Sequence, residues 1–129
     1  MQPEPDLQTI ERVTDWLYSL RNRTSKFGLE RMQLLAEVAG HPEKSSPCIH
    51  LAGTNGKGST AAMLEALYRA NGYTVGLYTS PHLLRLNERI QINRIAISDA
   101  ELCEQVRRLV KTAAPVFKPE NFPSFFECI

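Results

Sequence analysis

One stretch of the sequence combines the residue types that binding a phosphate requires. Gly53-Thr54-Asn55-Gly56-Lys57-Gly58-Ser59-Thr60 follows a short apolar run and precedes a segment with helical spacing. Glycines let backbone N–H groups approach an anion closely, and the free N–H groups at a helix N-terminus favour negative charge. Lys57 would place a positive charge at the terminal phosphates, and the hydroxyl of Ser59 or Thr60 would suit Mg²⁺. Residues 53–60 are therefore predicted to hold nucleotide phosphates, with Lys57 as the catalytic cation.

This loop departs from the usual P-loop pattern G-x-x-x-x-G-K-[ST] at two positions. Leu51 stands where the first glycine would be, and Gly58 follows Lys57 where a hydroxyl would be. These departures disfavour a generic P-loop kinase. A glycine-rich turn that only joins a strand to a helix is a second alternative. The lysine at the centre of the loop, between an expected strand and an expected helix, favours a phosphate site over that turn.

The apolar spacing predicts the elements that must position this loop. Apolar residues recur at helical intervals over residues 7–20 and 29–39, which indicates two amphipathic helices. Cys48–Ala52 has the length of one buried strand, Ser59–Ala70 has helical spacing, and Tyr73–Thr79 is rich in β-formers. The order strand, loop, helix, strand predicts a βαβ unit with parallel strands and a right-handed crossover.

The second half of the sequence predicts a hairpin, a helix and the start of another apolar element. Arg89–Ile97 alternates in polarity around Asn93-Arg94, and Ser98-Asp99-Ala100-Glu101 has the form of a capping box before a helix that ends before Pro115. The chain stops inside the apolar segment Ser124–Ile129. We therefore expect a truncated, P-loop-containing α/β fold with a mostly parallel sheet and flanking helices. Residues 1–46 would form an amino-terminal helical segment, and residues 47–129 part of an ATP-binding domain.

Composition and charge narrow the classes of protein and partner. The chain has 129 residues, 43% of them apolar, and carries 15 Lys and Arg against 14 Asp and Glu. Such a balance indicates a globular domain with no electrostatic signal for nucleic acid. The three cysteines form no C-x-x-C pair, and the first residues are acidic and proline-bearing. A cytoplasmic protein without membrane or nucleic-acid partners is expected.

Two motifs in the right order resemble one family of ligases. Leu51–Thr60 reads L-A-G-T-N-G-K-G-S-T, and Tyr78–Leu83 followed by Asn87–Ile90 resembles a second signature of the same family. Phe27–Arg31 and Ser124–Glu127 match further segments. On these residues the chain resembles the folate branch of the Mur ligase superfamily, the folylpolyglutamate and dihydrofolate synthases. The resemblance covers nearly the whole chain and implies a Mur ligase-like central ATP-binding domain.

The resemblance implies an ATP-dependent amide ligase that adds L-glutamate to dihydropteroate, to folates or to both, through an acyl phosphate. ATP and Mg²⁺ would be the cofactors, and the full-length protein would be a monomer. The loop 53–60 would bind the phosphates, and Ser59 and Ser80 would be ligands of Mg²⁺. The family's other metal ligands, a glutamate and a histidine, come from segments beyond Ile129. We therefore expect the fragment alone to be inactive.

The resemblance also implies a pteridine site built from two segments. By position in the family, the residues would be Ser25, Lys26, Phe27, Pro123, Ser124, Phe125 and Phe126. Aromatic faces suit a flat heterocycle. Burial of Phe125 or Phe126 in the core of the helix that they begin remains an equal alternative for each ring.

Other interpretations of the sequence stay open. A peptidoglycan-type Mur ligase shares the loop and the chemistry but would lack the second signature. A non-catalytic nucleotide-binding module could keep the loop as a scaffold. His82 would be a base, a ligand or a hydrogen-bonded loop residue, and Glu88 with Arg89 would position a ligand or form a solvated ion pair. His50, inside the expected buried strand, is predicted to be a core histidine.

Overall fold

The computed structural model of the chain describes residues 5–22 and 28–129. The chain divides into two compact units, one made of 1–48 with 100–129 and the other of 49–99. We call them the helical unit and the sheet unit. The first boundary lies close to the expected one at 46/47, whereas residues 100–129 group with the amino-terminal helices.

The helical unit contains three of the helices that the apolar spacing predicts, together with a short helix in the apolar segment at the end of the sequence. Its α-helices are α1 (Ile10–Ser19), α2 (Glu30–Val38), α4 (Asp99–Ala113, of which Ala100 onward belongs to this unit) and α5 (Phe125–Cys128). Short 3₁₀ turns cover Leu20–Asn22, Pro42–Lys44 and Pro119–Asn121. The hydroxyl oxygen of Thr9 accepts the N–H of Arg12 at the start of α1, which satisfies one of the donors that a helix start leaves free. No described helix is long and apolar enough to span a bilayer.

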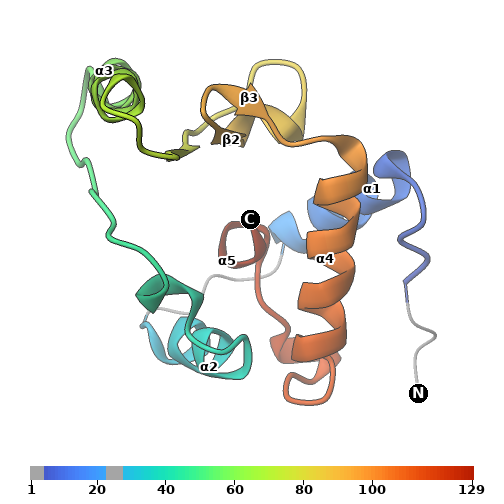
Figure 1. Cartoon of the computed structure of the whole chain (residues 1–129). Coiled ribbons are helices and arrows are strands. Elements are labelled where there is room, and N and C mark those ends of the chain that lie inside the picture. The colour runs from blue at the N-terminus through green and yellow to red at the C-terminus, as the bar shows by residue number, and fades with distance from the viewer. Residues whose placement is uncertain (1–4, 23–27) are drawn as a thin grey trace. The chain divides into compact units, whose positions relative to one another are not determined.

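Apolar side chains from distant parts of the sequence form the core of the helical unit. Val13, Leu17 and Phe125 are completely buried, and the rings of Tyr18 and Phe125 lie 5.7 Å apart. Figure 1 shows α5, at the end of the chain, beside the end of α1, and the two helices are in contact. A second cluster joins α2 to the end of α4 through Leu35, Ala113 and Phe117. Burial of this apolar surface is the main force that holds the unit together.

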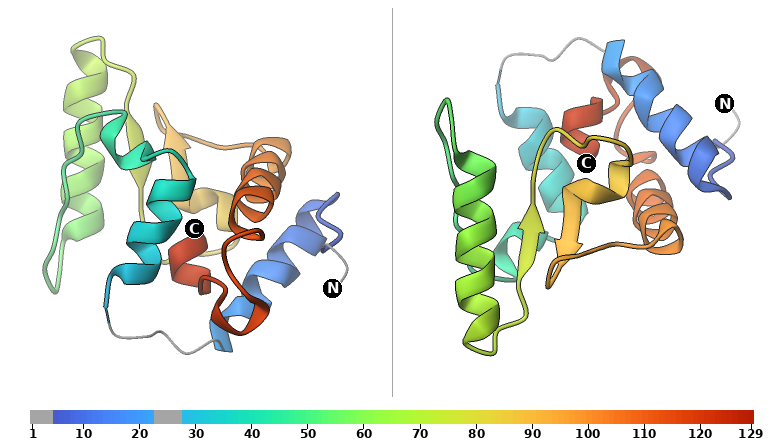
Figure 2. Two further views of the ribbon diagram at one scale, coloured as in Figure 1. Left: turned by 90° about the horizontal axis from the view of Figure 1, so that it is seen from below. Right: turned by 90° about the horizontal axis from the view of Figure 1, so that it is seen from above.

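The sheet unit consists of one long helix, three short strands and a 3₁₀ turn. Its elements are α3 (Lys57–Ala70), β1 (Gly76–Tyr78), η3 (Leu86–Arg89), β2 (Ile90–Ile92) and β3 (Ile95–Ala96). The strand order is β1-β2-β3, and Leu77 pairs with Gln91 in the first ladder. Asn93 and Arg94 both adopt positive φ, which is the backbone of a tight hairpin turn. The predicted hairpin is thus confirmed, and α3 runs alongside β1 (Figure 2).

Two predictions about the sheet are wrong for the described residues. Cys48–Ala52 forms no strand. Ile49 is 57% exposed. His50 is exposed as well, so it is not the core histidine that the sequence predicted. Both ladders of the described sheet are antiparallel, so the expected mostly parallel pairing is not found there. A short apolar run indicates that a segment favours burial, but a strand also needs a neighbouring strand to accept its hydrogen bonds. No such partner lies beside Cys48–Ala52 among the described residues.

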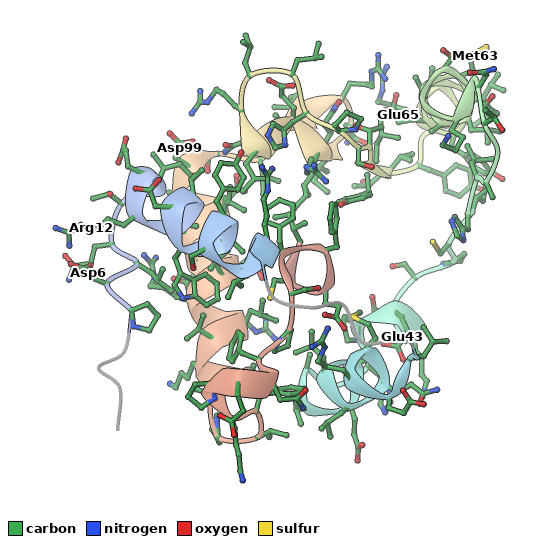
Figure 3. The ribbon with its side chains drawn as sticks, turned by 180° about the vertical axis from the view of Figure 1, so that it is seen from behind. Asp6, Arg12, Glu43, Met63, Glu65 and Asp99 are labelled. Carbon is green, nitrogen blue, oxygen red and sulfur yellow. The ribbon has the colours of Figure 1, made fainter. Side chains whose placement is uncertain are left out.

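The orientation of α3 also differs from what its sequence suggests. Met63 and Leu67, on the apolar face, are 60% and 62% exposed, whereas the side chain of Glu65 is buried (Figure 3). Glu65 Oε1 accepts a 2.8 Å hydrogen bond from Arg69 Nε, and Arg94 Nε of the hairpin turn lies 3.8 Å from Glu65 Oε2. The charge on the hairpin turn therefore lies against the face of α3 that carries Glu65.

Removing the Phe125 ring should destabilise the helical unit far more than removing the adjacent ring. We expect Phe125→Ala to lower the free energy of unfolding by about 3–5 kcal/mol, because the ring is fully buried. Phe126→Ala is the matched control, since that ring is 74% exposed, and should cost less than about 1 kcal/mol. Urea unfolding followed by the fluorescence of Trp16 measures both. Equal losses in the two variants would contradict the packing described above.

Candidate functional site

The glycine loop leads directly into the N-terminus of α3. Gly53 and Gly56 have φ values of +147° and +75°, which side-chain-bearing residues rarely adopt. Gly56 is the N-cap of α3, with no side-chain hydrogen bond to cap the helix. Thr60 N–H donates to the Gly56 carbonyl at 2.9 Å, so the N–H groups of the three preceding residues have no acceptor within the helix. The loop therefore offers exposed backbone donors and the positive end of the helix dipole at one place.

Lys57 adds a positive charge directly over this loop. Its Nζ donates to the carbonyl oxygens of Gly53 and, at 3.3 Å, of Thr54. The lysine side chain thus turns back along the loop rather than away from it. All residues from Ala52 to Thr60, including Asn55, are exposed, so an anion can reach both the ammonium group and the backbone donors. Lys57 and the helix terminus together can bind a polyanion such as a nucleotide phosphate chain.

The two hydroxyls of the first turn of α3 differ in availability. Thr60 Oγ1 donates to the Gly56 carbonyl at 2.9 Å and so closes the helix start. Ser59 is exposed on the same turn. Of the two candidates that the sequence suggested, Ser59 is therefore the better placed to contact a phosphate or a metal ion.

Ser80 lies on a second exposed segment of the same unit. It follows β1 by two residues and precedes a long loop that returns to β2. His82 in this loop accepts a 2.8 Å hydrogen bond from Arg89 Nε, so the interpretation as a hydrogen-bonded loop residue is the one that the structure supports. Glu88 and Arg89 do not form the ion pair that their adjacency suggested. Arg89 is buried toward His82 and Tyr78, and Glu88 binds backbone N–H groups instead.

The expected pteridine residues fall into three groups. Ser25, Lys26 and Phe27 lie outside the described residues. Pro123, Ser124 and Phe125 are buried, and Ser124 Oγ donates to Glu127 Oε2 at 2.6 Å to close the start of α5. Phe126 is 74% exposed. Phe125 is therefore a core ring, and Phe126 is the ring of this segment that can stack on a ligand.

An ion pair between α2 and α5 fixes the segment that carries Phe126. Arg31 Nε donates to Glu127 Oε1 at 2.7 Å, and both side chains are mostly buried. Burial by itself would raise the pKa of Glu127, but hydrogen bonds from Arg31 and Ser124 outweigh it and lower the pKa below its ordinary value. The spacing of residues in the sequence contained no signal for this pair, because its partners lie 96 positions apart.

The described residues offer hydroxyls but no carboxylate cluster for a metal ion. They contain no group of three His, Cys, Asp or Glu side chains that could hold one. Ser59 and Ser80 are both exposed, and neutral hydroxyls suit Mg²⁺ only alongside phosphate oxygens and water. They do not form a complete protein site for the ion.

Comparison with known proteins confirms the resemblance expected from the two motifs. No protein-family model matches the chain. The dihydrofolate synthase/folylpolyglutamate synthase of Bacillus subtilis (strain 168) is 45% identical over 94 residues, which cover 73% of this chain and 22% of that protein. The chain thus spans about a fifth of the length of this relative.

Solved structures agree with the sequence comparison. A folylpolyglutamate synthetase from Lactobacillus casei matches with a TM-score of 0.86 and 32% identity, over 94% of this chain and 31% of that chain. A complex of such a synthase with AMPPCP and folate matches with a TM-score of 0.87 and 32% identity, over 94% of this chain and 30% of that one. The described fold is therefore that of the corresponding part of these synthases.

Two glycines of the loop should respond differently to alanine. Gly56 needs its left-handed backbone, so Gly56→Ala should cost about 1–2 kcal/mol of stability even though a Cβ there would meet no atom. Gly58 has open space and no left-handed backbone, so Gly58→Ala should leave stability unchanged or raise it by up to about 1 kcal/mol. If the loop binds phosphate by close approach, Gly58→Ala should nevertheless weaken nucleotide binding at least tenfold. Thermal unfolding and calorimetric titration measure the two effects, and unchanged affinity in Gly58→Ala would contradict close approach.

The ion pair of Glu127 should make the helical unit sensitive to acid. A carboxyl whose pKa is lowered on folding stabilises the fold above its unfolded pKa of about 4.3, and this contribution is lost as the pH falls through the lower folded value. We expect the urea midpoint to fall between about pH 5 and pH 3, and less steeply in Glu127→Gln. Glu37→Gln is the control, since it makes the same charge change on an exposed position of α2. The same pH dependence in both variants would show that Glu127 does not cause it.

Proposed function

We propose that this chain, which is homologous to one part of the folylpolyglutamate and dihydrofolate synthases, provides the nucleotide-phosphate site of an ATP-dependent ligase. The ligase would add L-glutamate to dihydropteroate or to folates in the cytoplasm. The observation that carries the proposal is the fold match to a synthase in complex with AMPPCP and folate, together with an exposed glycine loop at an uncapped helix start. Neither feature alone would identify the reaction.

The proposed reaction has two displacement steps. A carboxylate oxygen of the pteroate or folate attacks the γ-phosphorus of ATP, and the bond from that phosphorus to ADP breaks. The amino group of glutamate then attacks the acyl carbon, loses a proton and displaces inorganic phosphate. A carboxylate is a weak nucleophile that approaches a polyanion, so the first step needs positive charge and exact alignment at the phosphates.

The residues of this chain would supply that charge and alignment. The N–H groups at the start of α3 would donate to the β- and γ-phosphates, with Gly53, Thr54, Asn55 and Gly56 shaping the loop around them. Lys57 would exchange its two carbonyl acceptors for phosphate oxygens, since these are stronger acceptors for an ammonium group. Ser59 and Ser80 would offer hydroxyl ligands to Mg²⁺, which would supply further neutralisation of negative charge.

The substrate ring would be bound from the helical unit. The exposed ring of Phe126 supports a stacking role, and the ion pair of Glu127 with Arg31 supports the rigid placement of that ring. Phe125, Ser124 and Pro123 would act by holding the start of α5. Ser25, Lys26 and Phe27 complete the proposed set on the grounds of the resemblance.

The proposed activity belongs to the whole synthase rather than to these 129 residues. The relatives are several times longer than the chain, and the described residues form no complete metal site. We therefore propose that the 129-residue chain binds nucleotide but releases no phosphate when it is given ATP, a folate and glutamate.

Nucleotide binding should depend on Lys57. We expect calorimetric titration with Mg-ATP to show binding by the chain, and Lys57→Ala to weaken it at least tenfold, or by about 1.4 kcal/mol. Lys111→Ala is the matched control, because Lys111 is an exposed lysine of α4 in the helical unit. Absence of binding, or equal affinity in the Lys57 variant, would reject the proposed phosphate site in favour of a structural turn.

A further inference from the structure

The segment from Thr79 to Arg89 is a closed loop with an exposed tip and a returning limb in which Leu86, Asn87 and Arg89 are buried. Thr79 N–H donates to the Arg89 carbonyl at 3.0 Å, which joins the two ends of the loop. At its tip, Leu83 and Leu84 are 89% and 90% exposed. Ser80, the proposed metal ligand, lies near the start of this loop. Because the tip buries almost no apolar surface, polar interactions must set its shape.

One carboxylate binds three consecutive backbone N–H groups at the tip. Glu88 Oε2 accepts the N–H of Leu83 at 2.7 Å, and Glu88 Oε1 accepts those of Leu84 at 3.0 Å and Arg85 at 2.8 Å. Successive N–H groups that converge in this way form an anion-binding concavity, occupied here by a side chain of the same loop. Hydrogen bonds from Leu83, Arg85 and Leu84 lower the pKa of Glu88, which keeps the carboxylate ionised at neutral pH.

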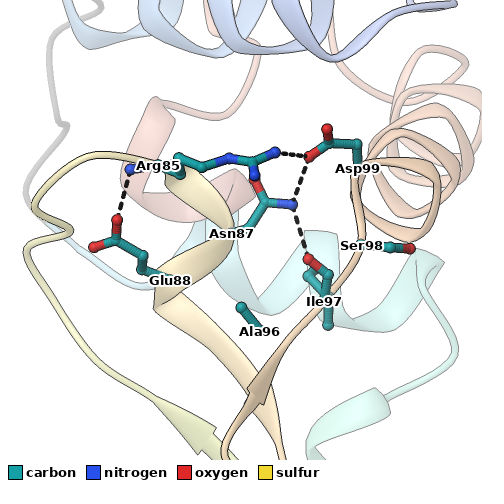
Figure 4. A pocket seen from close by; sticks show the side chains of 7 residues that line it. All are labelled: Arg85, Asn87, Glu88, Ala96, Ile97, Ser98 and Asp99. Carbon is teal, nitrogen blue, oxygen red and sulfur yellow. Dashed lines mark hydrogen bonds and ion pairs between the residues drawn. The ribbon is translucent and has the colours of Figure 1, made fainter.

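Other side chains attach the base of the loop to the hairpin and to the start of α4. Asn87 Nδ2 donates to the Ile97 carbonyl at 2.8 Å, and Arg85 Nη2 donates to Asp99 Oδ1 at 2.6 Å. These contacts line a cavity of about 310 Å³ whose wall also includes Glu88 (Figure 4). These contacts anchor only the returning limb of the loop, whereas Glu88 holds residues 83–85, which follow Ser80 by three to five positions.

We propose that Glu88 is a positioning residue: by binding the N–H groups of residues 83–85, it fixes the path of the loop and so the placement of the Ser80 hydroxyl. The inference rests on the proposed function, since it assigns Ser80 to the metal–nucleotide complex. Glu88 touches neither nucleotide nor metal in this scheme.

The geometry requires a carboxylate rather than a side chain that is merely polar. Both oxygens of Glu88 accept hydrogen bonds from N–H donors. In Glu88→Gln, one of these oxygens becomes an NH₂ group, which would face a backbone N–H and leave that donor without an acceptor. The variant keeps the size of the side chain, so its effect reports on charge and hydrogen bonding.

Amide NMR tests the contact itself. In the wild-type chain we expect the ¹H–¹⁵N signals of Leu83, Leu84 and Arg85 to shift together on acidification, with a midpoint below that of an ordinary glutamate. In Glu88→Gln this common titration should disappear, whereas Glu104→Gln, an exposed glutamate bonded to Arg107, should retain it. Retention of the titration in Glu88→Gln, or its absence from the wild type, would overturn the inference.

Nucleotide titration with and without Mg²⁺ tests the consequence for Ser80. We expect Glu88→Gln to weaken Mg-ATP binding about threefold to tenfold and to leave metal-free ATP binding unchanged. Ser80→Ala should have the same effect, and the double variant should be no weaker than either single one, because both act through the same hydroxyl. Additive losses, or an equal loss without Mg²⁺, would overturn the positioning role.

The amide NMR and the nucleotide titration together distinguish failure of this inference from failure of the proposed function. A wild-type chain that binds no nucleotide would reject the proposed function and, with it, the role of Glu88 in binding. The amide titration would still decide whether Glu88 holds the tip. A wild-type chain that binds Mg-ATP as expected, with Glu88→Gln unchanged, would reject the inference alone.

Discussion

Backbone N–H groups without a partner in their own secondary structure are the constraint on which the sheet unit depends. The unit contains two sets of such donors, one at the start of α3 and one at residues 83–85. The second set is satisfied by the carboxylate of Glu88. The first set is uncapped and exposed, with the ammonium group of Lys57 above it. The anion bound at residues 83–85 is thus a side chain of the protein. The donors at the start of α3 remain open to an anionic ligand.

In the helical unit, too, a carboxylate accepts a backbone N–H group at the start of a helix. The start of α5 is closed by Ser124 and Glu127, and Glu127 is in turn bound by Arg31 of α2. Because this network is mostly buried, the direction of α5 is well defined, and the two phenylalanines that follow Ser124 take opposite roles. Phe125 enters the core, and Phe126 remains at the surface. Because α5 has only about one turn, the position of the Phe126 ring depends on the ion pair that Arg31 of α2 makes with Glu127.

The unit that carries the loop also exposes apolar surface. Met63 and Leu67 on α3, and Ile49 before the loop, are all more than half exposed. The homologous synthases are several times longer than this chain. The match over 94% of the chain shows that its fold is similar to one part of those longer proteins.

Local chemistry explains why much could be predicted from the sequence. Apolar spacing located the four main helices and the hairpin, because both patterns depend on residues a few positions apart. The glycines of residues 53–60 and the apolar spacing after them predicted a loop that leads into a helix start, since both features depend on neighbouring residues. The two motifs were sufficient to indicate the synthase family.

The tertiary structure decided what depends on distant partners. Cys48–Ala52 is as apolar as a buried strand, yet it forms none, because pairing requires a neighbour that local sequence does not specify. Glu65 is buried beside Arg94 of the hairpin turn, and Phe125 is buried beside Tyr18 of α1 whereas Phe126 is exposed. Glu88 and Arg89 are adjacent in sequence and suggested a pair, but three amides and a histidine bind them separately. The free energy of folding depends on which groups are in contact, and the tertiary structure determines those contacts.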